Sequence, residues 1–95
     1  MTKTKAKLQS PLTIGASVLI RSVTNYYTGQ IVALERDMIV LRDAAWIAET
    51  GRFADALRTG TLGEVEPYPD GLVCVGRGAV IDVCVWAHPL PRVQR

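Results

Sequence analysis

Few residues of this sequence could carry out catalysis. His88 is the only histidine, and it stands before Pro89 in a proline-rich stretch. Catalysis by a histidine base needs a nucleophile within its reach and an acid that orients its ring. No serine or cysteine lies in a local motif of that kind, so we expect His88 to be an exposed residue and the protein not to be an enzyme.

The sequence also lacks the spacing of a metal site. A structural zinc site takes four ligands in close pairs, whereas the chain has only Cys74 and Cys84. The acidic residues Glu64, Glu66 and Asp70 do not have the spacing of a calcium loop. Both cysteines lie in apolar runs, so we expect them to pack as small apolar side chains, with a disulfide between strands as the alternative. The sequence predicts no metal and no cofactor.

Anion binding is the chemistry that the remaining residues could support. In the stretch Gly76-Arg77-Gly78, a guanidinium group and exposed backbone amides could hold a phosphate, but a tight turn with Arg77 paired to an acid is the alternative. Tyr26 and Tyr27 could stack on bases. Consecutive strand residues point to opposite faces, so at least one tyrosine should be buried. The net charge of +2 in 95 residues excludes a binder that relies on dense positive charge.

Five short runs of residues have the apolar, β-branched composition of strands. They span residues 15–25, 26–34, 38–41, 72–75 and 79–86. Gly29 lies inside the second run, where a glycine usually marks a sharp bend. This bend and the tight turn at residues 76–78 favour a strongly bent sheet that closes into a small barrel. We expect residues 59–71 to form an acidic loop.

A helical pattern interrupts the strands at about residues 44–60. Four residues have spacings of 4, 3 and 4, the period of one helix face: Trp46, Thr50, Phe53 and Leu57. We expect the regular helix to begin near residue 50 and to end at Gly60 as its C-cap. We expect the apolar stripe to cap an open end of the barrel and to contact a neighbouring subunit in part.

The order of these strands resembles the Sm-like superfamily. Residues 18–23, 27–32 and 38–44 are similar to its first motif, in which a strand pair with a central glycine leads into a third strand that ends in Leu-x-Asp-Ala. Residues 75–81 are similar to its second motif, which places Arg-Gly before the last strand. The stretch that begins at Gly29 also resembles the bacterial host-factor RNA chaperones. The resemblance implies a mainly β chain folded as a small five-stranded Sm-like (SH3-like) barrel, here with one short inserted helix.

The sequence departs from the family pattern at three points. Family members usually begin with a helix, whereas the only helical pattern here follows the third strand. The family commonly has an RNA-contacting Asn three residues before the Leu of the first motif, and Met38 stands at this position. An Asn often follows Arg-Gly in the second motif, and Ala79 stands there. Two base-reading positions are therefore apolar, which disfavours RNA recognition and leaves the fold unaffected.

The composition favours self-association. Apolar residues make up 48% of a chain too short to bury all of them. A small, partly open barrel has two unpaired strand edges, and pairing the fourth strand of one subunit with the fifth strand of the next uses both. We expect such an interface to contain five apolar residues: Val73, Val75, Val80, Val83 and Phe53.

These observations predict a non-enzymatic, homo-oligomeric ring with a structural or scaffolding role. The alternative is an Sm-like RNA-binding protein or RNA chaperone that contacts RNA, or lines a pore, through four residues: Arg77, Arg21, Tyr26 and Met38. We expect residues 1–12 to be a basic tail, residues 13–88 the barrel domain and residues 89–95 an extended tail. The chain shows no signal peptide and no apolar run of about 18 residues, so we expect a cytoplasmic protein without a membrane partner.

Overall fold

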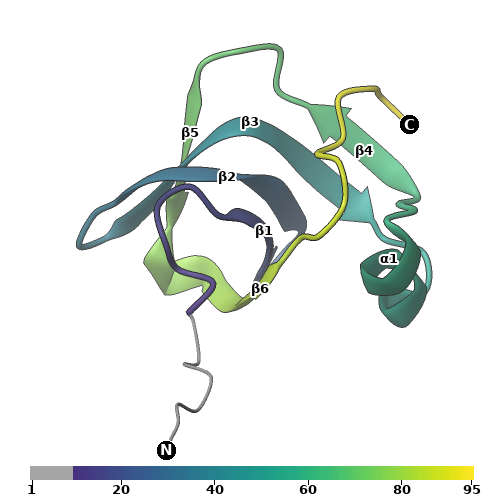
Figure 1. The fold of residues 1–95 in the computed structure, drawn as a ribbon, viewed down its shortest axis with the longest axis horizontal. Helices are drawn as coiled ribbons and strands as arrows, with labels where there is room; N and C mark the ends of the chain where they lie inside the picture. Colours follow the sequence, from purple (N-terminus) through teal and green to yellow (C-terminus); the bar gives the residue numbers. More distant parts are fainter. Residues whose placement is uncertain (1–9) are drawn as a thin grey trace, which may run out of the picture.

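Six antiparallel strands and one short helix make up the protein in a computed structural model that describes residues 10–95 (Figure 1). The elements are β1 (Ser17–Ser22), β2 (Tyr26–Leu34), β3 (Met38–Glu49), α1 (Phe53–Thr59), β4 (Glu64–Pro67), β5 (Leu72–Gly76) and β6 (Val80–Val85). A single turn of 3-10 helix, η1 (Arg77–Ala79), joins β5 to β6. The predicted mainly β chain with one short helix is confirmed. Residues 1–9 of the predicted basic tail lie outside the described residues.

The strands form one open sheet in the order β4-β3-β2-β1-β6. The long strand β3 has two partners on one edge, because residues 38–42 pair with β5 and residues 45–49 pair with β4. Within residues 10–95, no strand pairs with the outer edge of β5 or of β6. The expected closure into a barrel is therefore wrong, and the sheet has six strands where the sequence predicted five. The Sm-like form of the fold stays a prediction.

Residues 44–49 extend β3 instead of beginning a helical insert. Ala45 and Ile47 are fully buried while Trp46 between them is 38% exposed, which is the alternation of a strand. Their pairing with Tyr26, Tyr27 and Thr28 of β2 overrides the helical spacing. The predicted stripe is therefore divided between a strand, a turn and a helix. The predicted acidic loop also contains a strand, because β4 pairs with the second half of β3.

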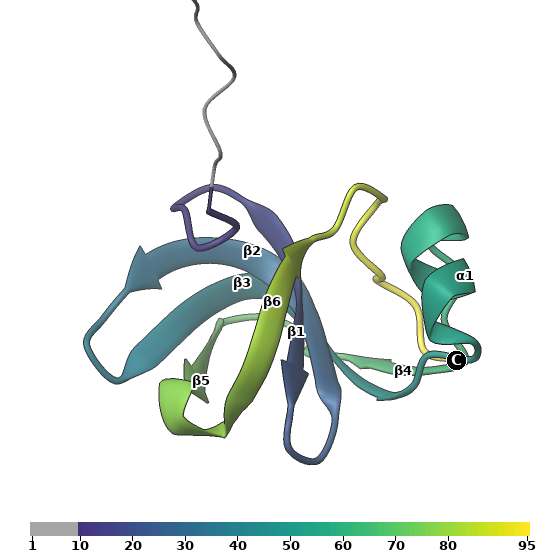
Figure 2. The same ribbon diagram turned by 90° about the horizontal axis from the view of Figure 1, so that it is seen from below.

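The helix α1 occupies only the end of the predicted helical segment. It ends at Gly60, whose φ of 80° is left-handed and whose N–H donates to the Ala56 carbonyl oxygen, so the predicted C-cap is confirmed. Ala56 is the buried residue of this helix, and Phe53 is 36% exposed. The helix lies on one side of the sheet, away from β5 and η1 (Figure 2). Because the sheet of residues 10–95 is open, there is no closed barrel for the helix to cap, and its contact with a neighbouring subunit stays a prediction.

Apolar side chains pack on both faces of the sheet. The first cluster contains Val18, Ile20, Ile31, Ile39, Leu41, Ala44 and Val75. Leu12, which the sequence placed in the tail, packs against this cluster. The second cluster contains Leu19, Ala45, Ile47, Ala56, Leu62, Val65 and Trp86. Strand β1 therefore contributes to both clusters.

Residues 87–95, which we call the strap, leave β6 and run along the side of α1 and β4 (Figures 1 and 2). Leu90 of the strap packs against the second cluster. The predicted extended tail is therefore docked on the sheet.

A bulge bends the centre of the sheet. Thr28 lies opposite Ala45 and Gln30 opposite Arg42, so Asp43 and Ala44 together face Gly29. A Cβ at Gly29 would lie 3.1 Å from the Leu41 side chain, which explains the glycine that the sequence associated with a bend.

Candidate functional site

The structure brings the four predicted contact residues together in two pairs. Met38 lies opposite Gly76 in the β3–β5 ladder, directly before Arg77 of η1. Arg21 lies opposite Tyr26 in the β1–β2 ladder. We call Met38 and Arg77, with the backbone of residues 76–78, the η1 site.

Backbone contacts fix the η1 site against the β2–β3 turn. The Arg77 N–H donates to the carbonyl oxygen of Asp37 at 2.9 Å. The Nε atom of Arg77 is buried and has no hydrogen-bond partner within the described residues. The ion pairs of residues 10–95 do not include Arg77 either. No acidic residue among the described residues therefore pairs with Arg77, as the alternative interpretation required.

The glycines on both sides of Arg77 leave open space beside the turn. A Cβ added at Gly76 or Gly78 would meet no atom within 4 Å. Neither glycine has a positive φ, so the turn does not require glycine for its backbone conformation. An anion could approach the turn here and meet the guanidinium group of Arg77, whereas the Arg77 N–H is already bonded to Asp37.

Arg21 and Tyr26 are part of an outer cluster with Phe53 and Asp82. Arg21 donates to the Asp82 carboxylate from Nε at 3.1 Å and from a terminal nitrogen at 2.5 Å. This hydrogen bond and the charge of Asp82 raise the pKa of Arg21. The Arg21 guanidinium lies 5.9 Å from the centre of the Phe53 ring, which stacks on Tyr26 at 5.9 Å. Arg21 is therefore already neutralised, and Tyr26 is partly covered.

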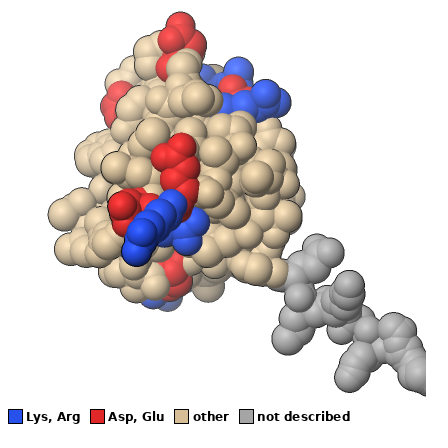
Figure 3. Space-filling model, turned by 90° about the vertical axis from the view of Figure 1, so that its left-hand side faces the viewer, with Lys and Arg blue, Asp and Glu red and all other residues tan. Residues whose placement is uncertain are grey.

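Charged side chains of both signs gather at the β2–β3 turn, where Glu35, Arg36 and Asp37 are all exposed. Figure 3 shows this side of the molecule, where acidic and basic side chains gather together and the surrounding surface is mostly uncharged. The face drawn there carries no continuous basic stripe of the kind that nucleic-acid binding uses.

The predicted interface valines point to the core. Val75 is 4% exposed, and Val73, Val80 and Val83 pack against the first cluster. The exposed apolar residues of the same two strands are their neighbours: Leu72, Ile81 and Val85, at 64%, 56% and 59%. The sequence analysis missed these three residues, and the alternation of side chains along each strand was the signal that could have found them.

His88 and the cysteines differ in part from expectation. The His88 Nε2 lies 2.7 Å from the carbonyl oxygen of Leu57, and its ring packs edge-on against Trp86, so this histidine is half-buried. Cys74 is exposed, while Cys84 packs against the second cluster, and both are free thiols. Burial, with a contribution from Asp82, raises the pKa of Cys84. The described residues contain no cluster of three potential metal ligands.

No protein-family model matches the chain, and neither a curated protein nor a solved structure shows significant similarity to it. Among residues 10–95, no helix combines the length and the apolar character that crossing a bilayer requires.

Proposed function

We propose that the chain is a divergent Sm-like subunit that assembles edge to edge into a homo-oligomeric ring with a structural or scaffolding role. The observation that carries this proposal is the pair of unpaired edges on β5 and β6, which adjoin each other through η1. Unpaired edges are templates for pairing with another chain. A contact between two different edges repeats from subunit to subunit and closes into a ring where the rotation allows it.

The exposed side chains of these strands support the same proposal. Leu72, Ile81 and Val85 surround the two edges and are each more than half exposed. Pairing β5 of one subunit with β6 of the next would remove apolar surface of this kind from water, at about 25 cal/mol per Å². The backbone edges would supply hydrogen bonds and the side chains would supply most of the free energy of association.

The test compares Ile81→Lys with Ile14→Lys by sedimentation velocity. Ile14 precedes β1 and is 65% exposed, so it matches Ile81 in residue type and exposure. We expect the parent and Ile14→Lys to sediment as the same oligomer and Ile81→Lys to sediment as a monomer. A monomeric parent protein, or an oligomer that survives Ile81→Lys, contradicts assembly through the β6 edge.

RNA binding at the η1 site is the second candidate. It is favoured by the buried Arg77 Nε that has no partner in the described chain and by the free space at Gly76 and Gly78. It is disfavoured by the apolar Met38 and by the pairing of Arg21 with Asp82. We therefore rank it below the structural ring.

Titration of binding to single-stranded U-rich and A-rich RNA at several salt concentrations tests this candidate. If Arg77 contacts a phosphate, Arg77→Ala should reduce the slope of log affinity against log salt concentration by the equivalent of about one phosphate contact. Arg58→Ala should leave this slope unchanged. Arg58 is a suitable control because it is exposed and pairs with Asp55 on α1. Absence of binding at low salt would eliminate the RNA candidate.

A further inference from the structure

Polar contacts of His88, Arg92 and Arg95 hold the strap against α1 and the sheet. His88 contacts the Leu57 carbonyl oxygen at the end of α1. Arg92 donates to the Asp43 carboxylate at 2.8 Å. Arg95 reaches β4, where its N–H donates to the Val65 carbonyl oxygen at 2.9 Å and the Val65 N–H donates back at 3.1 Å.

The contact with β4 has the geometry of strand pairing. Two residues that exchange both N–H···O bonds form a hydrogen-bonded pair of an antiparallel ladder. Beside it, the Gln94 side-chain amide donates to Glu66 at 3.0 Å. The strap therefore occupies the β4 edge that faces away from β3.

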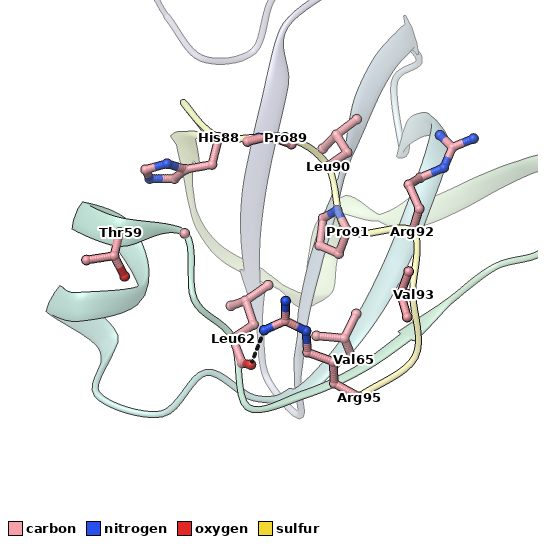
Figure 4. A pocket seen from close by; sticks show the side chains of 11 residues that line it. Thr59, Leu62, Val65, His88, Pro89, Leu90, Pro91, Arg92, Val93 and Arg95 are labelled. Atoms are coloured by element: carbon pink, nitrogen blue, oxygen red, sulfur yellow. Dashed lines mark hydrogen bonds between the residues drawn. The ribbon is translucent and has the colours of Figure 1, made fainter.

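The strap crosses a groove without filling it. A cavity of about 280 Å³ separates it from the end of α1 and from β4 (Figure 4). A second cavity of about 340 Å³ lies between the strap, the bulge at Asp43 and the β4–β5 connection. Pro91 and Arg92 line both cavities, and Val93 is 72% exposed. Apart from Leu90, which packs against the second cluster, the strap is held mainly by polar contacts, so its departure would uncover only part of that cluster.

The bulge presents Asp43 to this groove. Asp43 has a φ of 52°, the single positive value among the non-glycine residues 10–95. Such a conformation costs free energy, and bulges often redirect a side chain at a binding site. Arg42 lies 3.9 Å from the same carboxylate but donates to Gln30, so Arg92 is the close cationic partner of Asp43.

We propose that this groove is a binding site for an extended, proline-containing segment that carries an arginine, and that its occupant is the strap of a second copy of the chain. The strap in place shows the recognised chemistry: a guanidinium on Asp43, a strand-like backbone on β4 and a histidine at the end of α1. The same segment from another copy makes identical contacts, so exchange between copies costs little free energy. Pro89 and Pro91 restrict the segment and reduce the entropy that it loses on docking. The proposal does not require the ring, because two copies suffice.

A charge exchange between two chains tests the proposal. The substitution Asp43→Arg sets two guanidinium groups against each other within one chain, and Arg92→Glu sets two carboxylates against each other. Each variant alone repels its own strap, but in a mixture the Asp43→Arg groove meets a strap of complementary charge from the Arg92→Glu chain. Random pairing of equal amounts gives twice as many mixed pairs as pairs of either variant with itself, and we expect native mass spectrometry of differently tagged variants to show mixed pairs well above that proportion. The random proportion, or an absence of pairs, would overturn exchange between copies.

A second arm leaves the strained Asp43 unchanged. Full-length Arg92→Ala, whose own strap lacks the guanidinium contact, is titrated with a fluorescent peptide of residues 87–95. We expect it to bind this peptide about tenfold more tightly than the same peptide with Arg92→Glu, the loss for one charged hydrogen bond. Equal binding of a scrambled peptide, or no binding of any peptide, would contradict the claim that the groove is a binding site. Peptide binding without mixed pairs would overturn the second copy as the occupant.

Discussion

The two ends of the open sheet are protected very differently. At the β4 end, Glu64 and Glu66 are exposed, and the strap pairs with the strand at Val65. At the β6 end, Ile81 and Val85 are exposed, and no described segment covers the edge. Charged residues and covering segments are the devices by which monomeric sheets prevent edge pairing. One end of this sheet therefore has the features of a protected edge, and the other has those of an assembly surface.

The anchor of the strap can be loosened at Gly60. A Cβ there would lie 2.7 Å from the His88 ring, and the backbone is left-handed. We expect Gly60→Ala to destabilise the protein by about 2–4 kcal/mol, measured by thermal unfolding, and to speed hydrogen exchange of the Val65 amide. Gly51→Ala is the matched control, since Gly51 has a φ of 72° with no atom within 4 Å of the added Cβ. Equal effects of the two substitutions would show that His88 does not anchor the strap.

A substitution of Phe53 tests how much α1 contributes to the stability of the protected side of the sheet. Its ring is 36% exposed and stacks on Tyr26. We expect Phe53→Ala to cost about 1–2 kcal/mol, less than the 3–5 kcal/mol typical of a fully buried phenylalanine. Thermal unfolding at two protein concentrations measures it, with Phe53→Leu as the control. A larger loss that depends on concentration would place Phe53 in a subunit contact, as the sequence analysis expected.

The reactivities of the two thiols report on the unprotected edge and on the interior of the protein. Cys74 of β5 is exposed, whereas burial raises the pKa of Cys84 and so lowers its thiolate fraction. We expect alkylation of Cys84 to be slower than that of Cys74 and to require higher pH, followed by mass spectrometry. Assembly through β5 also predicts that Cys74 reacts faster in Ile81→Lys than in the parent. Identical rates in the two proteins would contradict burial of the β5 edge.

The smallest effect is expected for the ion pair between β1 and β6. Arg21 and Asp82 are both about half exposed, and surface ion pairs contribute little to stability. We expect Arg21→Ala to lower the melting temperature less than Phe53→Ala does, with Asp82→Asn as the control. A larger decrease for Arg21→Ala would mean that this pair is shielded from water, for example by a neighbouring subunit at β6.

Local signals account for the parts of the fold that were predicted. Residues close together in the sequence determine the conformation of several elements. These are the strands β1, β2, β5 and β6, the turn at residues 76–78 and the C-cap at Gly60. The second half of β3 was missed because Trp46, Phe53 and Leu57 happen to share a helical spacing, while pairing with β2 decides the conformation. Strand β4 was missed because Pro67 and its acidic neighbours are typical of a loop, although proline is tolerated in a strand of this kind at a sheet edge.

In the candidate sites too, contacts between residues far apart in the sequence were not predicted. The sequence analysis named Met38 and Arg77 together as possible contact residues, and the β3–β5 ladder brings them close because Met38 lies opposite Gly76. The contact of His88 with Leu57 joins residues that are 31 positions apart, and that of Arg21 with Asp82 joins residues 61 apart. No local pattern records such pairs, so the prediction of an exposed His88 was wrong and the pairing of Arg21 with Asp82 could not be predicted.

The molar mass of the parent protein in solution tests the central claim most directly. Light scattering at several micromolar concentrations, repeated for the double substitution Leu72→Lys and Ile81→Lys, compares an intact edge with a charged one. The account predicts a single oligomer several times the subunit mass of 10.4 kDa for the parent and 10.4 kDa for the double variant. A parent protein that remains at 10.4 kDa throughout would contradict the claim that β5 and β6 form an assembly surface.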